Sequence, residues 1–295
     1  MNPDRKLLVD AIDMHAHTHP ALFNRPIDDK DLAEHALEFG MRGIVLKDHD
    51  SLTTGRAYHV EPMFGGAVKV FGGVVLNRSV GGINPWVVET ALHYGARVIW
   101  MPSNHSKYHA EYFDTADYPQ LARRQRQLQG PGVTVFDERG KLKPEATTIC
   151  ELVAEHDACL ASGHLSLAET RALLDEANRA SVRKFLVTHA NWALTRYEPG
   201  IQKELIDAGA YLEYVAVSCV SPIFWEQKPD ELAAWIEELG GDRLILSSDL
   251  GQASAPPHPE GIRMLLSSML DVGADYDQLE KMTKANPAHL LGLAQ

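Results

Sequence analysis

Two histidines near the start of the chain, His15 and His17, have the spacing of a metal-binding pair. They close a short apolar run, and alternate residues of a strand point to the same side. A strand ending here would therefore direct both imidazoles toward one point. Imidazole nitrogens are common ligands of Zn²⁺ and related divalent ions. Two polar residues in a loop give the same pattern, so the pair by itself predicts only part of a site.

Further histidines and one aspartate lie just past other apolar runs of the sequence. Seven of the 14 histidines occupy such positions, namely His15, His17, His19, His49, His105, His164 and His189. Asp249 follows the last run in the same way. We expect the other seven histidines to be surface or structural residues, namely His35, His59, His93, His109, His156, His258 and His289. The repetition at one kind of position strengthens the prediction of a metal site.

Eight short apolar runs, alternating with helical patterns, are the elements that must position these residues. The runs cover 7–14, 43–47, 69–76, 97–102, 158–163, 184–189, 210–217 and 243–248. They are continuous rather than alternating, which is typical of strands buried on both faces of a parallel sheet. Asn84 and Ser166 are predicted helix caps, and Gly40 and Gly95 are predicted helix ends. We therefore predict an α/β fold, a single (β/α)8 TIM barrel over 1–295, whose strand ends meet on one face.

One segment, 105–145, is too long for an ordinary barrel connection after the fourth strand. It contains a polar, arginine-rich helical pattern at 118–130 and a hairpin pattern at 133–144. Connections of this length are usually functional. A lid over the site and an assembly element are the two interpretations.

The composition restricts the partners of the protein. With 28 Lys and Arg against 40 Asp and Glu, the net charge is −12, whereas nucleic acids and anionic membranes attract basic faces. No apolar run approaches the roughly 18 residues of a membrane span, and the start does not resemble a signal peptide. Three cysteines without a CxxC pair fit a reducing compartment. We expect a cytoplasmic protein with a small-molecule substrate, no nucleic acid and no membrane partner; a homo-oligomer is an open alternative to a monomer.

The pattern of strand-end residues resembles the amidohydrolase superfamily of metal-dependent hydrolases. The resemblance rests on the HxH pair, on one residue after each of the fifth, sixth and eighth runs, and on the chain ending, namely His15, His17, His164, His189, Asp249 and 286–293. Within the superfamily, the chain is most similar to phosphotriesterase-like and dihydroorotase-like small barrels. The resemblance implies a metal-activated water that cleaves an amide, cyclic amide, imide or lactone bond. It also implies one or two zinc ions, with manganese or iron as alternatives.

The same residues suggest a division of roles at the predicted site. His15, His17, His164 and Asp249 would hold the ion, and Asp249 would also take the water proton as general base. His189 would either complete a second metal site or stabilise a developing oxyanion. The number of ions stays open.

Lys47 and His49 depart from the superfamily pattern. Many binuclear members carry a bridging, carboxylated lysine after strand four, where this chain has Ser103, Asn104 and His105. Lys47 is predicted instead to be a metal-bridging or catalytic residue, or a substrate-binding ammonium; a solvated loop lysine is the alternative. The segment around His49 is similar to PHP-type phosphoesterases, with His49 as an extra ligand. A PHP-like phosphoesterase and a mononuclear metal-dependent decarboxylase are therefore the alternatives to a hydrolase.

Four further residues are predicted to contact the substrate because of their places near strand ends or on strands. They are Arg78, Asn104, His105 and Tyr214. An arginine after strand three could clamp a carboxylate with two hydrogen bonds. A surface salt bridge is the alternative for Arg78.

Overall fold

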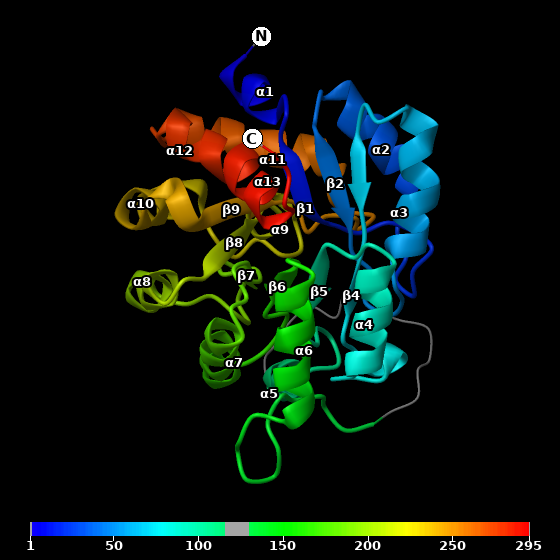
Figure 1. Ribbon diagram of the computed structural model, residues 1–295. Coiled ribbons are helices and arrows are strands. Elements are labelled where there is room, and N and C mark those ends of the chain that lie inside the picture. The colour runs from blue at the N-terminus through cyan, green and yellow to red at the C-terminus, as the bar shows by residue number, and fades with distance from the viewer. Residues whose placement is uncertain (1, 116–129, 295) are drawn as a thin grey trace.

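Parallel strands surrounded by helices make up the computed structural model, which describes residues 2–115 and 130–294 (Figure 1). The strands are β1 (Ile12–Ala16), β2 (Gly43–Leu46), β3 (Lys69–Phe71), β4 (Gly73–Val75), β5 (Val98–Trp100), β6 (Cys159–Ala161), β7 (Phe185–Val187), β8 (Tyr211–Val215) and β9 (Leu244–Ser247). They pair in two parallel sheets, in the orders β1-β2-β3 and β4-β5-β6-β7-β8-β9. The predicted α/β fold with parallel strands is therefore confirmed.

The two sheets follow one another around a ring. β3 and β4 are consecutive parts of one segment, interrupted at Gly72, where an added Cβ would lie 2.6 Å from backbone atoms of Thr53 and Thr54. At the other junction β1 lies beside β9, since the Asp249 N–H donates to the His15 carbonyl over 2.8 Å. This cyclic order is that of an α/β barrel. The ladders of the described residues nevertheless remain two sheets, so a fully closed barrel is not shown.

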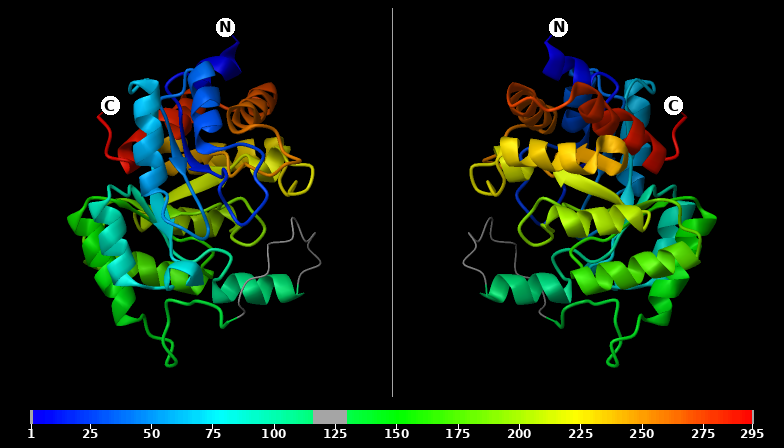
Figure 2. Two further views of the ribbon diagram at one scale, coloured as in Figure 1. Left: turned by 90° about the vertical axis from the view of Figure 1, so that its right-hand side faces the viewer. Right: turned by 90° about the vertical axis from the view of Figure 1, so that its left-hand side faces the viewer.

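Helices lie outside the strands in all three ribbon views (Figures 1 and 2). The α-helices are α1 (Pro3–Leu8), α2 (Asp29–Glu38), α3 (Thr54–Val60), α4 (Pro85–His93), α5 (Lys107–Thr115), α6 (Pro144–Glu155), α7 (Leu167–Arg179), α8 (Pro199–Asp207), α9 (Val217–Val220), α10 (Pro229–Leu239), α11 (His258–Asp271), α12 (Tyr276–Glu280) and α13 (Asn286–Leu290). Short helical turns occupy η1 (Glu61–Phe64), η2 (Arg78–Val80), η3 (Gly241–Arg243) and η4 (Lys281–Ala285). Among these helices, none combines the length and apolar character needed to cross a bilayer.

Local sequence signals explain several helix starts. The Asn84 side chain accepts the Trp86 N–H at the start of α4, and Ser166 and Glu169 form the predicted capping box at the start of α7. The predicted strand at 7–14 is partly wrong, because its first residues belong to α1. Pro3 favours the first turn of that helix, and the chain turns at Asp10, where φ is +63°, before β1 begins.

Apolar strand residues fill the space enclosed by the strands. This inner cluster includes Met14, Val45, Trp100 and Leu186, all nearly inaccessible to solvent, and α13 packs against it through Leu290. A second, larger cluster joins the outer strand faces to the helices. The polar residues that follow the strands are therefore the groups left to line the opposite, carboxyl ends.

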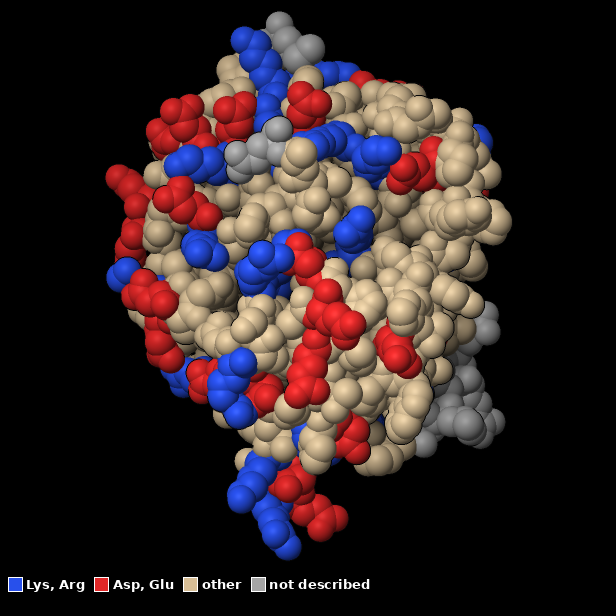
Figure 3. All heavy atoms as spheres, viewed as in Figure 1, with Lys and Arg blue, Asp and Glu red and all other residues tan. Residues whose placement is uncertain are grey.

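The 105–145 insertion contains α5 and a hairpin. In the hairpin Phe136 pairs antiparallel with Leu142, and the Asp137 N–H donates to the Lys141 carbonyl. The arginine-rich pattern at 118–130 lies almost entirely outside the described residues. On the face drawn in Figure 3, acidic and basic side chains are interspersed, so the acidic surplus forms no single patch there.

Candidate metal centre

Asp249 meets both histidines of the HxH pair at the junction of β1 and β9. Its Oδ1 atom lies 3.0 Å from His15 Nε2 and 3.1 Å from His17 Nε2. His15 and His17 are buried, at 0% and 3% exposure. The two ring nitrogens and the carboxylate therefore converge in the interior of the protein, as the spacing along the strand predicts.

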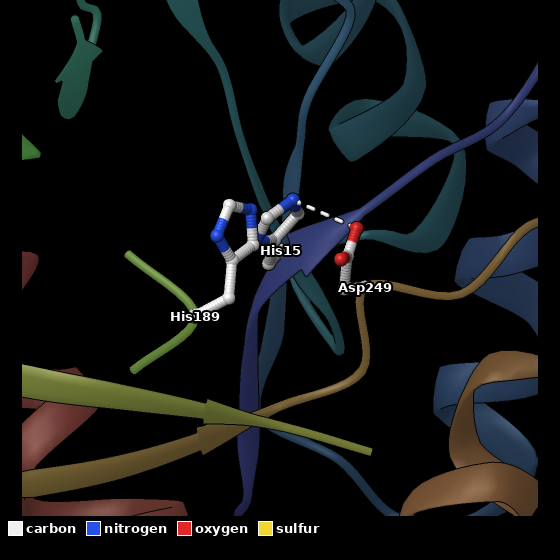
Figure 4. A group of neighbouring side chains, drawn as sticks. All are labelled: His15, His189 and Asp249. Atoms are coloured by element: carbon white, nitrogen blue, oxygen red, sulfur yellow. Dashed lines mark ion pairs between the residues drawn. The ribbon is translucent and has the colours of Figure 1, made fainter. Parts of the chain in front are cut away.

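His189 contributes a further donor atom to this group, from a third strand end. It follows β7, and its donor atom lies within 4.8 Å of those of His15 and Asp249. Figure 4 shows the three side chains, which come from separate segments of the chain. Within the described part of the chain, this is the one group of three or more such donors close enough to hold an ion.

The Nδ1 atoms of His15 and His17 both have hydrogen-bond partners on the protein. His15 Nδ1 lies 3.1 Å from Glu213 Oε2, and His17 Nδ1 donates to the Lys47 carbonyl over 2.9 Å. Both Nε2 atoms are thereby turned toward Asp249. Metal-binding histidines usually have such a partner on the other ring nitrogen, because it sets the ring orientation and tautomer.

Glu213 is a site residue that the sequence analysis missed. It lies on β8 with 0% exposure and also accepts the His189 N–H over 3.2 Å. One carboxylate therefore joins β1, β7 and β8. An acidic residue inside the apolar run 210–217 was the available signal, because a charge on a buried strand needs partners.

Two site residues have backbone conformations that side chains rarely adopt. His189 has a φ of +40° and Asp249 a φ of +49°. Hydrogen bonds from their own N–H groups, to Glu213 and to the His15 carbonyl respectively, hold these conformations. Strained residues of this kind occur often at functional sites.

The charges of the centre are strongly coupled. Burial alone would raise the pKa of Asp249, but the charge of His15 and hydrogen bonds from His15 and His17 hold that pKa well below its ordinary value. Burial alone would lower the pKa of His15, yet the charges of Asp249 and Glu213 outweigh burial and the charge of Lys47, so the pKa is raised. The carboxylate is therefore ionised and available as a ligand.

Three other histidines are kept neutral by burial. Burial lowers the pKa of His189 to about 3 and holds the pKa values of His17 and His164 well below the ordinary value. Nearby cations assist, including Arg25 beside His17. A neutral imidazole has a lone pair for a cation, so these residues are in the protonation state that metal binding requires.

Lys47 extends into the same buried region. Its Nζ atom lies 2.9 Å from His15 Nε2 and 5.5 Å from the centre of the Trp100 ring. The side chain is 2% exposed, and burial lowers its pKa to about 8. The interpretation of Lys47 as a solvated loop lysine is therefore wrong.

His164 and His49 lie beside the three-residue group rather than within it. The His164 ring is 4.8 Å from the His189 ring, and the His49 ring stacks on His17 at 4.7 Å. His49 Nδ1 is 2.8 Å from the Ser103 hydroxyl oxygen. Both predicted ligands thus border the centre.

The structure does not bring the predicted substrate residues Tyr214 and Arg78 to the centre. The Tyr214 hydroxyl donates to Gln202 of α8 over 2.6 Å, because alternation along β8 turns Glu213 inward and Tyr214 outward. Arg78 donates to the carbonyls of Gly130 and Pro131 in the insertion. The expectation of a substrate contact is corrected for Tyr214, and the Arg78 guanidinium holds backbone of the insertion.

Asn104 and His105 follow β5 as predicted, at the carboxyl end of that strand. His105 is 8% exposed, and its N–H donates to the Asn77 side chain over 3.1 Å. The Asn77 amide also bonds the His49 carbonyl and the Ser103 hydroxyl. Asn77 thus ties three strand ends together, while substrate contacts of Asn104 and His105 stay predictions.

Comparison with protein families decides the affiliation of the chain. Residues 10–213 match the model of DUF6282, described as a family of unknown function. The chain belongs to the DUF6282 family. No curated protein matches its sequence significantly.

Solved structures with the same fold include several enzymes. An amidohydrolase from Pseudomonas aeruginosa superposes on this DUF6282 protein with a TM-score of 0.65 at 13% identity, covering 99% of this chain and 98% of the other. The probable dipeptidase PvdM from the same organism gives 0.64 at 12%, covering 98% and 96%. Dihydroorotase from Saccharomyces cerevisiae gives 0.61 at 11%, covering 98% and 85%. The predicted resemblance to the amidohydrolase superfamily is confirmed for the fold.

The donor set of the DUF6282 protein suits a divalent ion. Imidazole nitrogens and one carboxylate are the ligands of zinc, manganese and iron sites. His15 Nε2 and His17 Nε2 both face Asp249 Oδ1, while their Nδ1 atoms are engaged elsewhere. This arrangement, in which each ring is already oriented, fits a bound cation.

One wall beside the donors is apolar. The Trp192 ring lies 5.2 Å from the His189 ring and 5.3 Å from the His164 ring. Trp192 belongs to a buried cluster with Val215, Val217 and Leu250. An apolar wall restricts water and strengthens electrostatic interactions within the site.

Proposed function

We propose that this DUF6282 protein is a metal-dependent hydrolase of a small metabolite, cleaving an amide, cyclic amide, imide or lactone bond. The observation that carries the proposal is the convergence of His15, His17, His189 and Asp249 at the carboxyl ends of parallel strands. The same fold in an amidohydrolase, a probable dipeptidase and a dihydroorotase supports it. We also infer that the strand ring is a single (β/α)8 barrel.

Zinc is the ion that we propose, with manganese or iron as alternatives. His15, His17 and Asp249 would hold it, with His189 beside them; His164, His49 and Lys47 would hold a second ion. When bound, the ion acts as a Lewis acid and lowers the pKa of a coordinated water to about 7. The Glu213 carboxylate keeps the His15 ring oriented, with its Nε2 atom toward the ion.

The residues of the chain have distinct chemical roles in this proposal. Asp249 is an ionised carboxylate that accepts the proton of the attacking water and returns it to the leaving nitrogen or oxygen. His189 is neutral, so its N–H stabilises the negative charge that develops on the carbonyl oxygen. The amine of Lys47 lies at His15 Nε2, the same nitrogen that faces Asp249, and there it contacts the water or the substrate.

A mononuclear metal-dependent decarboxylase is the second candidate. The observation that favours it is that the described residues form one group of three donors, and that His164 and His49 lie outside this group. A 2,6-dihydroxybenzoate decarboxylase has the same fold, with a TM-score of 0.58 at 10% identity. A PHP-like phosphoesterase has less support, because the His49 ring lies beside His17 and outside the three-donor group of the described residues.

The remaining sequence predictions accompany this proposal. They are a cytoplasmic location, a small-molecule substrate without nucleic-acid or membrane partners, a single domain with a 105–145 lid or assembly element, and a monomer or homo-oligomer.

Metal analysis followed by a substrate screen tests the function. Protein purified with zinc should contain at least one equivalent by mass spectrometry, and a library of amides, cyclic imides and lactones should include a substrate. Asp249→Asn should lower kcat by about 10²–10⁴-fold while most metal is retained. The matched control is Asp271→Asn, at an exposed position at the end of α11, which should leave kcat unchanged. Protein that binds no divalent metal would overturn the proposal, and release of CO₂ without hydrolysis would favour the decarboxylase.

A further inference from the structure

The start of helix α5, in the insertion, is hydrogen-bonded to His164, one of the predicted metal ligands. The buried Ser106 hydroxyl donates to the His164 carbonyl over 2.7 Å and accepts the His109 N–H over 2.9 Å. Ser106 thus satisfies a backbone group in the first turn of α5 and attaches that turn to the end of β6. The insertion therefore begins within the carboxyl end of the strand ring.

His109, in the first turn of α5, reaches the His164 side chain. The two rings stack with centroids 4.9 Å apart and planes inclined by 21°, and their Nδ1 atoms are 2.8 Å apart. At this separation one Nδ1 carries the proton and donates it to the other. The sequence predicts a surface or structural role for His109, and this contact corrects that prediction.

Phe113, a further turn along α5, continues the contact. Its ring is 4.4 Å from the His109 ring and 5.9 Å from the Trp192 ring. Trp192 in turn touches His164 and His189. The His109 side chain is therefore confined between the apolar wall and His164, which limits the rotamers available to both histidines.

We propose that His109 is a positioning residue for His164, which makes the first turn of α5 a part of the metal centre. By engaging Nδ1, His109 leaves Nε2 as the His164 nitrogen that faces an ion or a substrate. Loss of a partner of this kind typically weakens metal binding by about 10–100-fold. The inference rests on the proposed function, because His164 needs a set orientation only if the centre binds an ion.

Cobalt binding tests the inference without a known substrate. Co²⁺ replaces zinc in sites of this type and reports ligand geometry by its visible spectrum. His109→Phe keeps a stacking ring but removes the hydrogen bond, whereas His109→Asn keeps a polar atom near the position of Nδ1. His93→Phe, at an exposed position on α4, is the matched control. Thermal melts of the metal-free variants check folding.

We expect His109→Phe to weaken Co²⁺ binding by about 10–100-fold and to change the spectrum. His109→Asn and added imidazole should restore part of both, and His93→Phe should match the parent protein. Equal affinity and an equal spectrum for His109→Phe would overturn the inference while the proposed function stands. Equal losses in both His109 variants without rescue by imidazole would also overturn it, because they indicate packing alone. A parent protein that binds no Co²⁺ would instead refute the proposed function.

Discussion

Glu213 shows at the scale of a residue how the centre is organised. Its carboxylate lies against His15 Nδ1 and accepts the His189 N–H, so it sets the direction of the His15 ring and holds the backbone of His189. Burial alone would raise the pKa of Glu213, but the charge of His15 and its hydrogen bond outweigh burial and keep that pKa below the ordinary value. An ionised, fully buried carboxylate thus holds two of the donor residues, His15 and His189, in position.

Replacing Glu213 by glutamine should weaken zinc binding by about 10–100-fold, because an outer partner of a ligand is lost. Competition with a chromophoric chelator measures the change. Glu237→Gln, at an exposed position on α10, is the control and should bind zinc normally. Unchanged affinity in the Glu213 variant would show that His15 keeps its orientation without this carboxylate.

Lys47 should leave a signature in the pH dependence of stability of the metal-free protein. Its pKa is lowered from 10.5 to about 8 in the folded state, so between these values the unfolded chain binds the additional proton. The free energy of unfolding should therefore rise as pH increases from about 8 to about 10.5. Urea titrations across this range should give a shallower rise for Lys47→Met than for the parent. Parallel curves would place Lys47 in a more polar environment.

At the scale of elements, the junction of β1 with β9 is the critical contact. Gly251, two residues beyond Asp249, has a φ of +122°, and an added Cβ would lie 2.1 Å from the His17 carbonyl oxygen. Only glycine lets the segment after β9 approach the end of β1 this closely. The close approach brings Asp249 to both histidines of the pair.

Gly251→Ala should therefore lower both the metal content and the melting temperature, because the two strand ends must separate. Gly55→Ala is the control, since Gly55 lies in α3 and an added Cβ there meets nothing within 4 Å. Alanine is also the better helix former, so the control should be neutral or slightly stabilised. Metal content that is normal in both variants would contradict the importance of this junction.

The strand pattern was predictable because buried parallel strands are continuous apolar runs, and their polar ends identify one face. β2, β5, β6, β7 and β9 all lie inside their predicted runs. The strand prediction was wrong for residues 7–8 because the buried end of α1, Leu7 and Leu8, leads directly into the apolar residues of β1. Glu213 had a signal in the sequence, because it is a charge within a buried apolar run, whereas the position of His109 depends on tertiary packing that local sequence does not reveal.

At the scale of the whole molecule, the centre joins distant parts of the fold. The donors come from the ends of β1, β7 and β9, so an ion bound there would connect elements from the start, middle and end of the chain. Binding to the folded state alone stabilises a protein by mass action. Metal and stability should therefore be coupled.

Zinc at 100 times its dissociation constant should add about 2.7 kcal/mol to the free energy of unfolding. For a chain of this size, this corresponds to an increase in melting temperature of roughly 5 °C. Differential scanning calorimetry with and without a chelator measures the difference. A variant lacking two donors, His15→Ala with His17→Ala, should show no zinc-dependent shift. An equal shift in that variant would place the stabilising ion elsewhere.

The meeting of β1 with β9 also has a consequence during translation. His17 and Asp249 touch although 232 residues separate them in the sequence. At about 5–20 residues per second, a ribosome needs roughly 10–50 s to make the intervening chain. Throughout that interval the emerging polypeptide exposes a histidine pair that lacks its carboxylate partner. The proposed metal centre is therefore complete only when the last strand joins the first.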